Sequence, residues 1–576
     1  MISETKIHSH SSVSMACQNC KSDFIVEPDD FSFYEKMKVP APTFCPECRR
    51  MRRLAWYNLM NLFHRNCDLC GEKFISTYPK EAPYVVYCHK CWWSDKWSFQ
   101  DFGVDYNFSK PFFQQFDELM HKVPLLGITN STTITGFPYN NYETYIKDCY
   151  FTFDSDFNQE CAYGITMTRN RESFDSSMIM DCDTCYDCMN LFKSHHIVGT
   201  RGNNRFCIDC YFVRDCENCQ DCFMCAGLRN KKYFFKNKQY TKEEYENLKN
   251  QYNLGSYKDY IRAKIDTEEF WKSVPPKPVW DTMSVDSSGS YVFNSKNCHE
   301  CYDVSDCEDS KYLLAIYRKT QKNCYDLSTF GFNIENIYEG MNIFENSSYI
   351  KFCDGCGLNA INIEYCKSVI GGQNCFGCVS VRKGENVIFN KVYSKEEFKI
   401  LREKIIKHMD EMPYIDKLGN IYKYGEFFPV ELSPFPYNMT FAQLFNPKAK
   451  NEIEEIGGSY LEENKNEYNI TKKSEDIPDN IKDVEDSILN EVIGCNKCGR
   501  GYKIIEMELR FLRKMNLPIP HECPFCRMNE KLNLWVDNMH LKDRICDKCG
   551  RDFKTHWNKE RAPLIYCKEC YKMEFL

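Results

Sequence analysis

The chain has no apolar run long enough to cross a membrane and no excess of basic residues. None of its apolar stretches approaches the roughly 18 residues of a spanning helix, and the first six residues, MISETK, lack the apolar core of a signal peptide. The formal charge of -8 at pH 7 argues against a protein that coats nucleic acid with its whole surface. We therefore expect a cytoplasmic protein.

Alanine and leucine are sparse, and the common catalytic motifs are missing. The scarcity of these helix formers, together with 37 tyrosines and 41 phenylalanines, favours strands and turns over helical bundles. There is no P-loop, Rossmann fingerprint, nucleophile elbow or HExxH motif. The sequence therefore leans away from an enzyme, and its 576 residues exceed what one hydrophobic core usually organises.

Cysteine is abundant, with 36 residues. In a large chain without an export signal, these thiols are expected to stay reduced, as metal ligands or as small buried hydrophobic groups, rather than to form disulfides. Sixteen of them form CxxC pairs near the two ends: Cys17, Cys20, Cys45, Cys48, Cys67, Cys70, Cys88, Cys91, Cys495, Cys498, Cys523, Cys526, Cys546, Cys549, Cys567 and Cys570. Two such pairs supply the four soft ligands of tetrahedral Zn²⁺, so about four zinc sites are predicted.

The expected grouping is sequential, with Cys17 to Cys48 on one ion and Cys67 to Cys91 on the next, although interleaved ligation is an alternative. Four thiolates close the coordination shell and leave no position for an activated water, so these sites are predicted to be structural. Gly71 and Gly550 follow a CxxC pair, where a turn that closes on a metal often needs positive φ.

In the interior, a cysteine followed by an aromatic residue recurs at spacings of about twelve, first between 149 and 223 and again between 301 and 376. Short strands at even spacing predict a duplicated β-solenoid, in a fold that is mostly β with some α. The two blocks end in similar residues 153 positions apart, so that Thr241 corresponds to Ser394 and Glu244 to Glu397. Thr241 with Glu244, and Ser394 with Glu397, form capping boxes and predict helices near 241–275 and 394–411.

The predicted segments follow one another along the chain. They are a disordered N-terminus (1–16), a paired zinc-ribbon module (17–100), a first solenoid block with its helix (141–275), a second (288–411), a proline-containing strap with an acidic linker (412–492), and a second paired zinc-ribbon module (493–576). A short helix is expected near 481–492.

Two interior features have alternative interpretations. The strings CDTCYDC (182–188) and CENCQDCFMC (216–225) suit inward packing in a solenoid, and the alternative is a metal or Fe–S site. Arg49, Arg50, Arg52 and Arg53 form a candidate nucleic-acid-binding face, with tryptophans nearby to stack bases. The favoured interpretation of the arginines is a solvated face above a tryptophan in a small zinc-held core.

The terminal modules resemble treble-clef zinc-ribbon domains, which run from a CxxC knuckle through an aromatic strand and a helix to a terminal CPxCR. The C-terminal copy keeps the register of the first, with Phe33 and Phe511, and Pro40 and Pro518, at equal offsets. Most of the chain also resembles a family of uncharacterised cysteine-rich zinc-ribbon proteins of candidate-phyla (Patescibacteria-like) bacteria, through passages such as FCPECRRMRRLAW, WWSDKW, YGEFFPVELSPFPYN and YCKECY. This resemblance implies an architecture and no particular activity.

The leading functional hypothesis is a non-enzymatic zinc-binding scaffold whose solenoid surface binds a macromolecular partner, protein or RNA. One alternative is a nucleic-acid- or ribosome-associated factor that grips phosphate through the four arginines. Another is a redox or metal-handling protein that uses the interior cysteines. No membrane partner is expected.

Overall fold

The structure is a computed structural model that describes residues 11–130, 134–316, 320–462 and 469–575. It is mostly β and divides into two compact units. Unit 1 contains residues 1–128 and 281–461, and unit 2 contains residues 129–280 and 462–576. Each unit therefore combines one cysteine-rich terminal segment with the solenoid block that is more distant from it in sequence.

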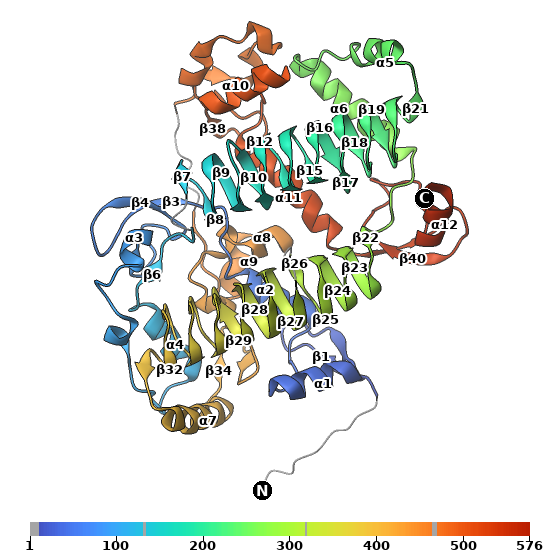
Figure 1. The fold of residues 1–576 in the computed structure, drawn as a ribbon. Coiled ribbons are helices and arrows are strands. Elements are labelled where there is room, and N and C mark those ends of the chain that lie inside the picture. The colour runs from blue at the N-terminus through green and yellow to red at the C-terminus, as the bar shows by residue number, and fades with distance from the viewer. Residues whose placement is uncertain (1–10, 131–133, 317–319, 463–468, 576) are drawn as a thin grey trace. The chain divides into compact units, whose positions relative to one another are not determined.

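The solenoid of unit 2 is a stack of short parallel strands, drawn in cyan and green in Figure 1. Its strands are β7 (Thr135–Gly136), β8 (Asn141–Thr144), β9 (Lys147–Asp156), β10 (Ala162–Ile165), β11 (Met167–Thr168), β12 (Arg171–Phe174), β13 (Ser177–Met180), β14 (Asp183–Tyr186), β15 (Met189–Phe192), β16 (His195–Arg201), β17 (Asn204–Arg205), β18 (Ile208–Arg214), β19 (Gln220–Ala226), β20 (Lys232–Phe235) and β21 (Lys238–Gln239). Only the last pair, β20 with β21, is antiparallel.

Each coil of this stack is about twelve residues long and turns a corner every third residue. Successive coils pair Ala162 with Phe174, and Phe174 with Tyr186. Every third residue has a left-handed backbone, as at Phe151, Asp154 and Phe157, with φ of 57, 51 and 57°. A left-handed residue bends the chain sharply. Because one occurs at every third position, a coil of about twelve residues has about four corners.

Inward-facing side chains form columns across the coils. In register, Cys185 lies beside Ile197, Ile197 beside Cys210, and Cys210 beside Cys222. All four are fully buried in one apolar cluster with Phe234. The predicted β-solenoid, with its cysteines in inward ladders, is confirmed.

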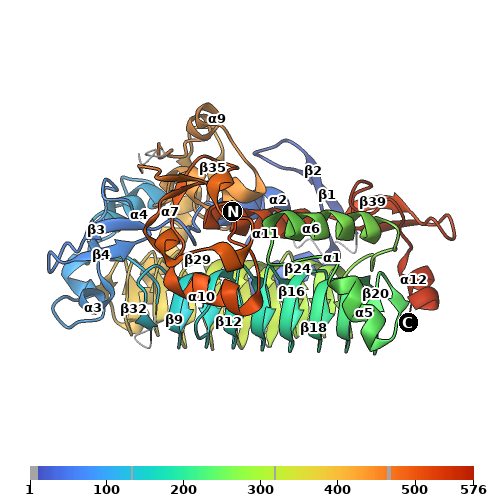
Figure 2. The ribbon, with the colours of Figure 1, turned by 90° about the horizontal axis from the view of Figure 1, so that it is seen from above.

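Helices flank the solenoid of unit 2. They are α5 (Lys242–Lys249), α6 (Tyr257–Lys272), α10 (Glu506–Met515), α11 (Pro524–Asn538) and α12 (Lys568–Phe575). The capping box of Thr241 and Glu244 starts α5, as predicted. Figure 2 shows α6 running along the stack, where the indole N–H of Trp271 donates to the carbonyl of Cys225 at 3.1 Å.

Unit 1 contains the second solenoid, which has the same construction. Its strands are β22 (Asp281–Thr282), β23 (Val285–Phe293), β24 (Lys296–Ser305), β25 (Cys307–Lys311), β26 (Leu314–Ile316), β27 (Gln321–Phe330), β28 (Ile334–Ile343), β29 (Ser348–Asp354), β30 (Ile361–Glu364), β31 (Gln373–Phe376), β32 (Glu385–Ile388) and β33 (Lys391–Val392). The predicted capping box of Ser394 and Glu397 starts α7 (Lys395–Glu411).

The N-terminal segment of unit 1 begins earlier than expected. Its elements are β1 (Val13–Ala16), β2 (Asp23–Val26), α1 (Pro28–Met37), α2 (Pro46–Leu54), β3 (Phe63–Asn66), β4 (Lys73–Ser76), β5 (Val86–Tyr87), α3 (His89–Trp92), α4 (Phe112–Met120) and β6 (Leu125–Leu126). Because β1 pairs with β2 in an antiparallel hairpin, the disorder predicted over 1–16 does not hold for residues 13–16. Residues 1–10 lie outside the described part of the chain.

The proline-containing strap is irregular, as predicted. Within unit 1 it carries β34 (Tyr414–Ile415), β35 (Ile421–Tyr422), the short helix α8 (Phe441–Phe445) and α9 (Lys450–Glu455). In unit 2, the helix expected near 481–492 is instead two 3₁₀ turns, Ile481–Asp483 and Asp486–Asn490. Across the described residues, no helix combines the length and the apolar character needed to span a bilayer.

Candidate metal centres and a charged pocket

The structure brings the sixteen terminal cysteines together in four groups of four. The groups are Cys17, Cys20, Cys45 and Cys48; Cys67, Cys70, Cys88 and Cys91; Cys495, Cys498, Cys523 and Cys526; and Cys546, Cys549, Cys567 and Cys570. Within each group, all four sulfur atoms lie within 4.8 Å of one another. The grouping is sequential within each module, and none of these groups is interleaved.

The spacing of the sulfur atoms fits a tetrahedral thiolate site. Cys20 and Cys45 have their sulfurs 3.7 Å apart, and those of Cys495 and Cys526 are 3.8 Å apart. A tetrahedron with metal–sulfur bonds of about 2.3 Å has edges of about 3.8 Å, which is the geometry of Zn²⁺ bound by four cysteines. The four groups can therefore each hold one metal ion with no position left for water.

Tight turns prepare these thiols for metal binding. Gly71 and Gly550 both have φ of 74°, and their N–H groups donate to the carbonyls of Cys67 and Cys546 at 2.8 and 2.9 Å. Burial disfavours the thiolate of Cys546, but backbone N–H groups, including that of Cys567, lower its pKa to about 6. Thiolates of this kind bind metal at neutral pH.

Helix α2, which begins directly after Cys45, the third cysteine of the first group, attaches this cysteine group to the solenoid of unit 1. In α2, the Arg49 guanidinium lies 2.8 Å from the carboxylate of Asp326, and Arg52 lies 2.9 Å from both Glu339 and Glu426. Arg53 is completely buried between Asp326 and Glu339. Phe33 of α1 stacks on a solenoid tyrosine with ring centroids 3.8 Å apart.

Unit 2 repeats this attachment with its own residues. Arg527 and Lys531 of α11 lie 478 positions after Arg49 and Arg53. Arg527 forms an ion pair with Asp175, and Lys531 lies 2.8 Å from Asp187. Asp175 and Asp187 lie on neighbouring coils, as Asp326 and Glu339 do in unit 1. Phe511, the counterpart of Phe33, stacks on Phe174 at 4.3 Å.

These contacts change the interpretation of the arginine cluster. Arg49, Arg52 and Arg53 have exposed fractions of 1, 3 and 0% and are paired with carboxylates. The expectation of a solvated arginine face was therefore wrong, because the solenoid supplies buried acidic partners. Only Arg50 is partly accessible, and it pairs with Glu47. The neighbouring tryptophans Trp56, Trp92 and Trp97 are buried, and Trp93 is exposed.

The interior cysteines are packed differently from the terminal ones. Among the described residues, the four terminal groups alone bring three or more potential ligands close enough to hold an ion. The thiol of Cys210 instead donates to the carbonyls of Ile208 and Cys219, at 3.3 and 3.5 Å. The CxxC spacing of the interior strings is therefore the spacing of inward positions along a coil with a corner every third residue.

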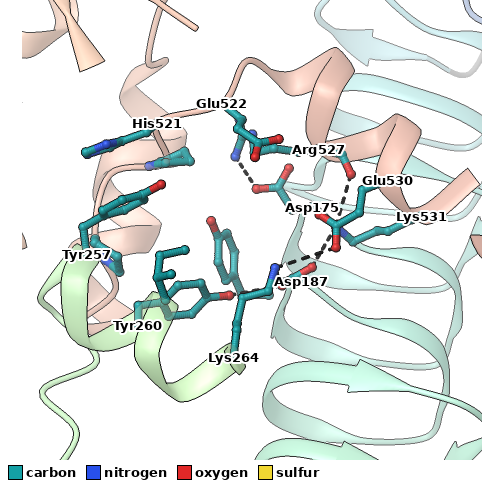
Figure 3. Close-up of a pocket in the computed structure, with 14 residues that line it drawn as sticks. Asp175, Asp187, Tyr257, Tyr260, Lys264, His521, Glu522, Arg527, Glu530 and Lys531 are labelled. Atoms are coloured by element: carbon teal, nitrogen blue, oxygen red, sulfur yellow. Dashed lines mark hydrogen bonds and ion pairs between the residues drawn. The ribbon is translucent and has the colours of Figure 1, made fainter. Parts of the chain in front are cut away.

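A pocket in unit 2 lies beside the attachment of α11 (Figure 3). Its cavity of about 70 Å³ is lined by Asp175, Tyr186, Asp187, Tyr257, Tyr260, Ile261, Lys264, Pro518, Pro520, His521, Glu522, Arg527, Glu530 and Lys531. The rings of Tyr257 and His521 stack with centroids 3.5 Å apart. No feature of the sequence had indicated this pocket, because its lining comes from three separate segments.

Three cationic side chains surround the Asp187 carboxylate at this pocket. Burial would raise the pKa of its carboxyl group, but Lys264, Lys531 and Arg201 hold that pKa well below its usual range. The Lys264 ammonium lies 3.2 Å from Asp187 and 3.8 Å from Glu530. Asp175 behaves oppositely, since burial raises its pKa in spite of Arg527.

The described residues thus form thiolate groups and buried ion pairs in both units, and a small charged cavity in unit 2. Comparison with protein-family models, with curated proteins and with solved structures finds no match to this chain.

Proposed function

We propose that this protein is a non-enzymatic zinc-binding scaffold. In this proposal, the terminal modules are treble-clef zinc ribbons, the four thiolate groups hold Zn²⁺, and the solenoids present a rigid outer surface to a protein partner in the cytoplasm. The observation that carries the proposal is the attachment of α2 and α11. Each helix starts at a cysteine group and carries cations whose ion pairs are buried against a solenoid.

This attachment supports a structural role for the metal. Cys45 is the residue that caps the N-terminus of α2, and Cys523 has the same place in α11. A bound ion would fix the first turn of each helix, and the next two turns carry the cations that enter the solenoid. Metal binding and helix attachment therefore stabilise one another.

The outer surface of unit 2 carries an exposed pair of aromatic rings that suits a protein partner. Tyr145 and Phe157 are exposed to 57 and 52%, and their rings are parallel with centroids 4.9 Å apart. Exposed aromatic pairs on a rigid support contribute strongly to protein interfaces, because little conformational entropy is lost on binding. The repeated coils hold both rings in place.

The alternatives have less support. A nucleic-acid-binding role through the arginine cluster requires guanidinium groups that are free to meet phosphate, and three of the four are buried in ion pairs. A redox role for the interior cysteines requires thiols that are accessible or close enough to share an ion. Those of Cys210 and Cys222 are fully buried and donate to backbone carbonyls.

Metal analysis and partner capture test the two parts of this proposal. Protein purified without added metal should contain about four zinc ions and no iron per chain. Bound partners should survive nuclease treatment, and capture should weaken in a Tyr145→Ala, Phe157→Ala double variant. Iron with visible absorbance would contradict the metal assignment, and loss of all partners after nuclease treatment would contradict the protein-binding assignment.

A further inference from the structure

Both solenoids end in the same antiparallel hairpin. In unit 1 it is formed by β32 and β33, and in unit 2 by β20 and β21, the last of which Figure 1 shows at the end of the stack. Phe389 and Asn390, at the turn in unit 1, have φ of 47 and 62°. Lys236 and Asn237, 153 positions earlier in unit 2, have φ of 45 and 59°. The two hairpins can therefore be compared position by position.

In unit 1, residues 99–106 lie on this hairpin and are called the covering segment below. The N–H of Val104 donates to the carbonyl of Phe389 at 3.0 Å. Gly103 approaches so closely that a Cβ atom on it would meet the carbonyl oxygen of Asn390 at 2.9 Å. Phe389 and Asn390 are completely buried in this unit.

The covering segment also places a carboxylate on the hairpin. Asp105 lies 2.6 Å from the Lys391 ammonium and accepts a hydrogen bond from the hydroxyl of Tyr393 at 3.5 Å. Unit 2 keeps both partners of this carboxylate as Lys238 and Tyr240. The ammonium lies 5.3 Å from the centre of the tyrosine ring in unit 2 and 5.8 Å in unit 1. The lysine and tyrosine that hold a carboxylate in unit 1 are therefore also in place in unit 2.

The described residues of unit 2 do not supply that carboxylate. Lys238 is exposed and forms no ion pair within the described part of the chain. The nearby Glu244 accepts the hydroxyl of the α5 capping box, as Glu397 does at α7, so this carboxylate is used in the same way in both units. Lys236 is half-exposed, whereas its counterpart Phe389 is buried. The hairpin of unit 2 thus presents to solvent the groups that unit 1 covers.

This hairpin is also more cationic than its counterpart. Three of its positions differ by a gain of lysine: Lys231 replaces Gly384, Lys232 replaces Glu385, and Lys236 replaces Phe389. Lys232 has a carboxylate nearby, that of Asp221 at 3.9 Å. Lys231 and Lys236 each lie 5.8 Å from a phenylalanine ring centre and pair with no carboxylate of the described residues. Cations without an anionic partner favour an acidic ligand through charge complementarity.

Two of these lysines stand where the covering segment of unit 1 uses aromatic rings. A Cβ atom built on Gly384 would lie 3.3 Å from the Phe99 ring. The ring of Tyr106 packs on Phe389, with centroids 5.5 Å apart. Because lysines occupy both hairpin positions in unit 2, acidic side chains suit the ligand there better than aromatic ones.

We propose that the hairpin of β20 and β21 binds an extended acidic segment of a protein partner, as the hairpin of unit 1 holds its own covering segment. One carboxylate of the partner lies between Lys238 and Tyr240, and two others meet Lys231 and Lys236. A backbone N–H of the partner donates to the carbonyl of Lys236, the counterpart of the Phe389 carbonyl. This inference rests on the proposed function, because it assigns a chemistry to the protein partner.

The test uses the full-length, metal-loaded protein and the labelled peptide Glu-Gln-Asp-Phe-Gly-Val-Asp-Glu, blocked at both ends. This peptide is the covering segment with glutamate in place of its two terminal aromatic residues. Fluorescence anisotropy at low ionic strength should show saturable binding at one site. The matched neutral peptide, with glutamine and asparagine for all acidic residues, should bind at least about tenfold more weakly. No binding of the acidic peptide, or equal binding of the two, would overturn the proposal.

Lysine variants then locate the site. Lys238→Met should weaken binding of the acidic peptide about threefold to fivefold, and the triple variant that also carries Lys231→Met and Lys236→Met about tenfold or more. Lys391→Met is the matched control, because its lysine has the same place in unit 1 and already pairs with Asp105. It should bind the peptide like the wild type. Undiminished binding by the triple variant would place the peptide elsewhere and refute the assignment.

A nucleic acid is the competing occupant of a lysine-rich surface. Pentauridylate without terminal phosphates carries the same net charge as the acidic peptide and serves as the competitor. It should displace the labelled peptide only at higher concentrations than unlabelled peptide does. Displacement at lower concentrations would show that the hairpin prefers phosphate and would overturn the assignment of an acidic peptide.

Two further outcomes separate this inference from the proposed function. Binding of the acidic peptide, in a protein whose captured partners are all lost after nuclease treatment, would support the hairpin site and contradict the protein-binding scaffold. Nuclease-resistant protein partners without any peptide binding would refute the hairpin site alone and leave the scaffold standing.

Discussion

Arg49 and Asp326 form an ion pair that is completely closed to solvent, with Nη2 and Oδ2 separated by 2.8 Å and exposed side-chain fractions of 1 and 0%. They are 277 positions apart in the sequence, and their pairing joins the first cysteine group to the second solenoid. A charge in such a place is stable only with its partner, because the desolvation cost of either ion alone is large. This pair is therefore a sensitive probe of the architecture of unit 1.

Replacing Arg49 by methionine should reduce the free energy of unfolding of unit 1 by about 1.5–3 kcal/mol, since the buried Asp326 loses its closer cation and keeps only Arg53, at 3.3 Å. Urea unfolding, followed by circular dichroism, measures the change. The double variant Arg49→Met, Asp326→Leu should recover part of the loss, because neither charge of this pair remains and Arg53 keeps Glu339 at 3.6 Å. A double variant as unstable as the single one would mean that packing, and not charge, holds α2.

Arg50 provides the matched control for this experiment. It lies one position further along α2 and pairs with Glu47, whose side chain is 55% exposed. Arg50→Met should therefore change the free energy of unfolding by about 1 kcal/mol or less. A loss as large as that of Arg49→Met would show that the helix itself, and not its buried ion pairs, is sensitive to substitution.

The lowered pKa of Asp187 predicts how the stability of unit 2 depends on pH. Burial opposes ionisation of this carboxyl group, but Lys264, Lys531 and Arg201 hold its pKa well below the ordinary value. A depressed pKa contributes stability that is fully present above the unfolded value of about 4 and is lost as pH falls through the folded value. Asp187→Asn should therefore destabilise the protein by a constant amount from about pH 5 to 8.

Below about pH 4, the difference between wild type and Asp187→Asn should shrink as the wild-type carboxylate gains its proton. Unfolding midpoints across this range give the measurement. Metal release at low pH affects both proteins and cancels in the comparison. A difference that persists undiminished to pH 2 would show that Asp187 acts through its hydrogen bonds alone.

Much of the solenoid can be predicted from the sequence, because its signal is local. The twelve-residue spacing from Cys210 to Cys222 predicts a coil length, and Thr241 with Glu244 predicts where a helix begins. The corner at every third residue was not recognised, although CENCQDCFMC repeats its cysteines at that spacing. Aspartate, phenylalanine and threonine all adopt left-handed φ there, so no glycine pattern marks the corners.

The attachment of the terminal modules could not be predicted in the same way. Arg49 and Arg53 read as solvated because their carboxylate partners are more than 270 residues away. One signal was present in the sequence, since Arg527 and Lys531 keep cations at both positions in the second copy. A repeated pair of cations one helical turn apart indicates a buried function more than it indicates a solvated face.

Cysteine variants should separate metal ligation from packing. Cys45→Ala removes one ligand of the first group and should lower the zinc content from about four to about three per chain. It should also weaken the attachment of α2, whose N-terminus Cys45 caps. The measurement is metal analysis together with urea unfolding of unit 1.

Cys222→Ala is the control for Cys45→Ala, because Cys222 is fully buried in the solenoid of unit 2 and outside the four cysteine groups. It should keep the full zinc content and lose about 1 kcal/mol of stability through the small cavity that it creates. Loss of a metal ion from this variant would assign a ligand role to the interior cysteines.

The knuckle glycine of the second group tests whether backbone conformation tunes metal affinity. Gly71 has φ of 74°, and a Cβ atom built on it meets nothing within 4 Å, so alanine would pay only the cost of a left-handed backbone. That cost is about 1–2 kcal/mol, which predicts a decrease in zinc affinity of about tenfold for Gly71→Ala in competition with a chelator. Lys21 adopts φ of 62° in the first group, so the variant should still fold.

Gly371→Ala is the matched change in the solenoid of unit 1. Its φ of 63° is similar, and its Cβ atom would make only ordinary contacts, the nearest at 3.5 Å. This variant should lose a comparable amount of stability and release zinc to the chelator like the wild type. If both glycine variants released zinc equally fast, general loosening of unit 1 would explain the effect. Release specific to Gly71→Ala requires that the left-handed turn positions the thiolates of the second group.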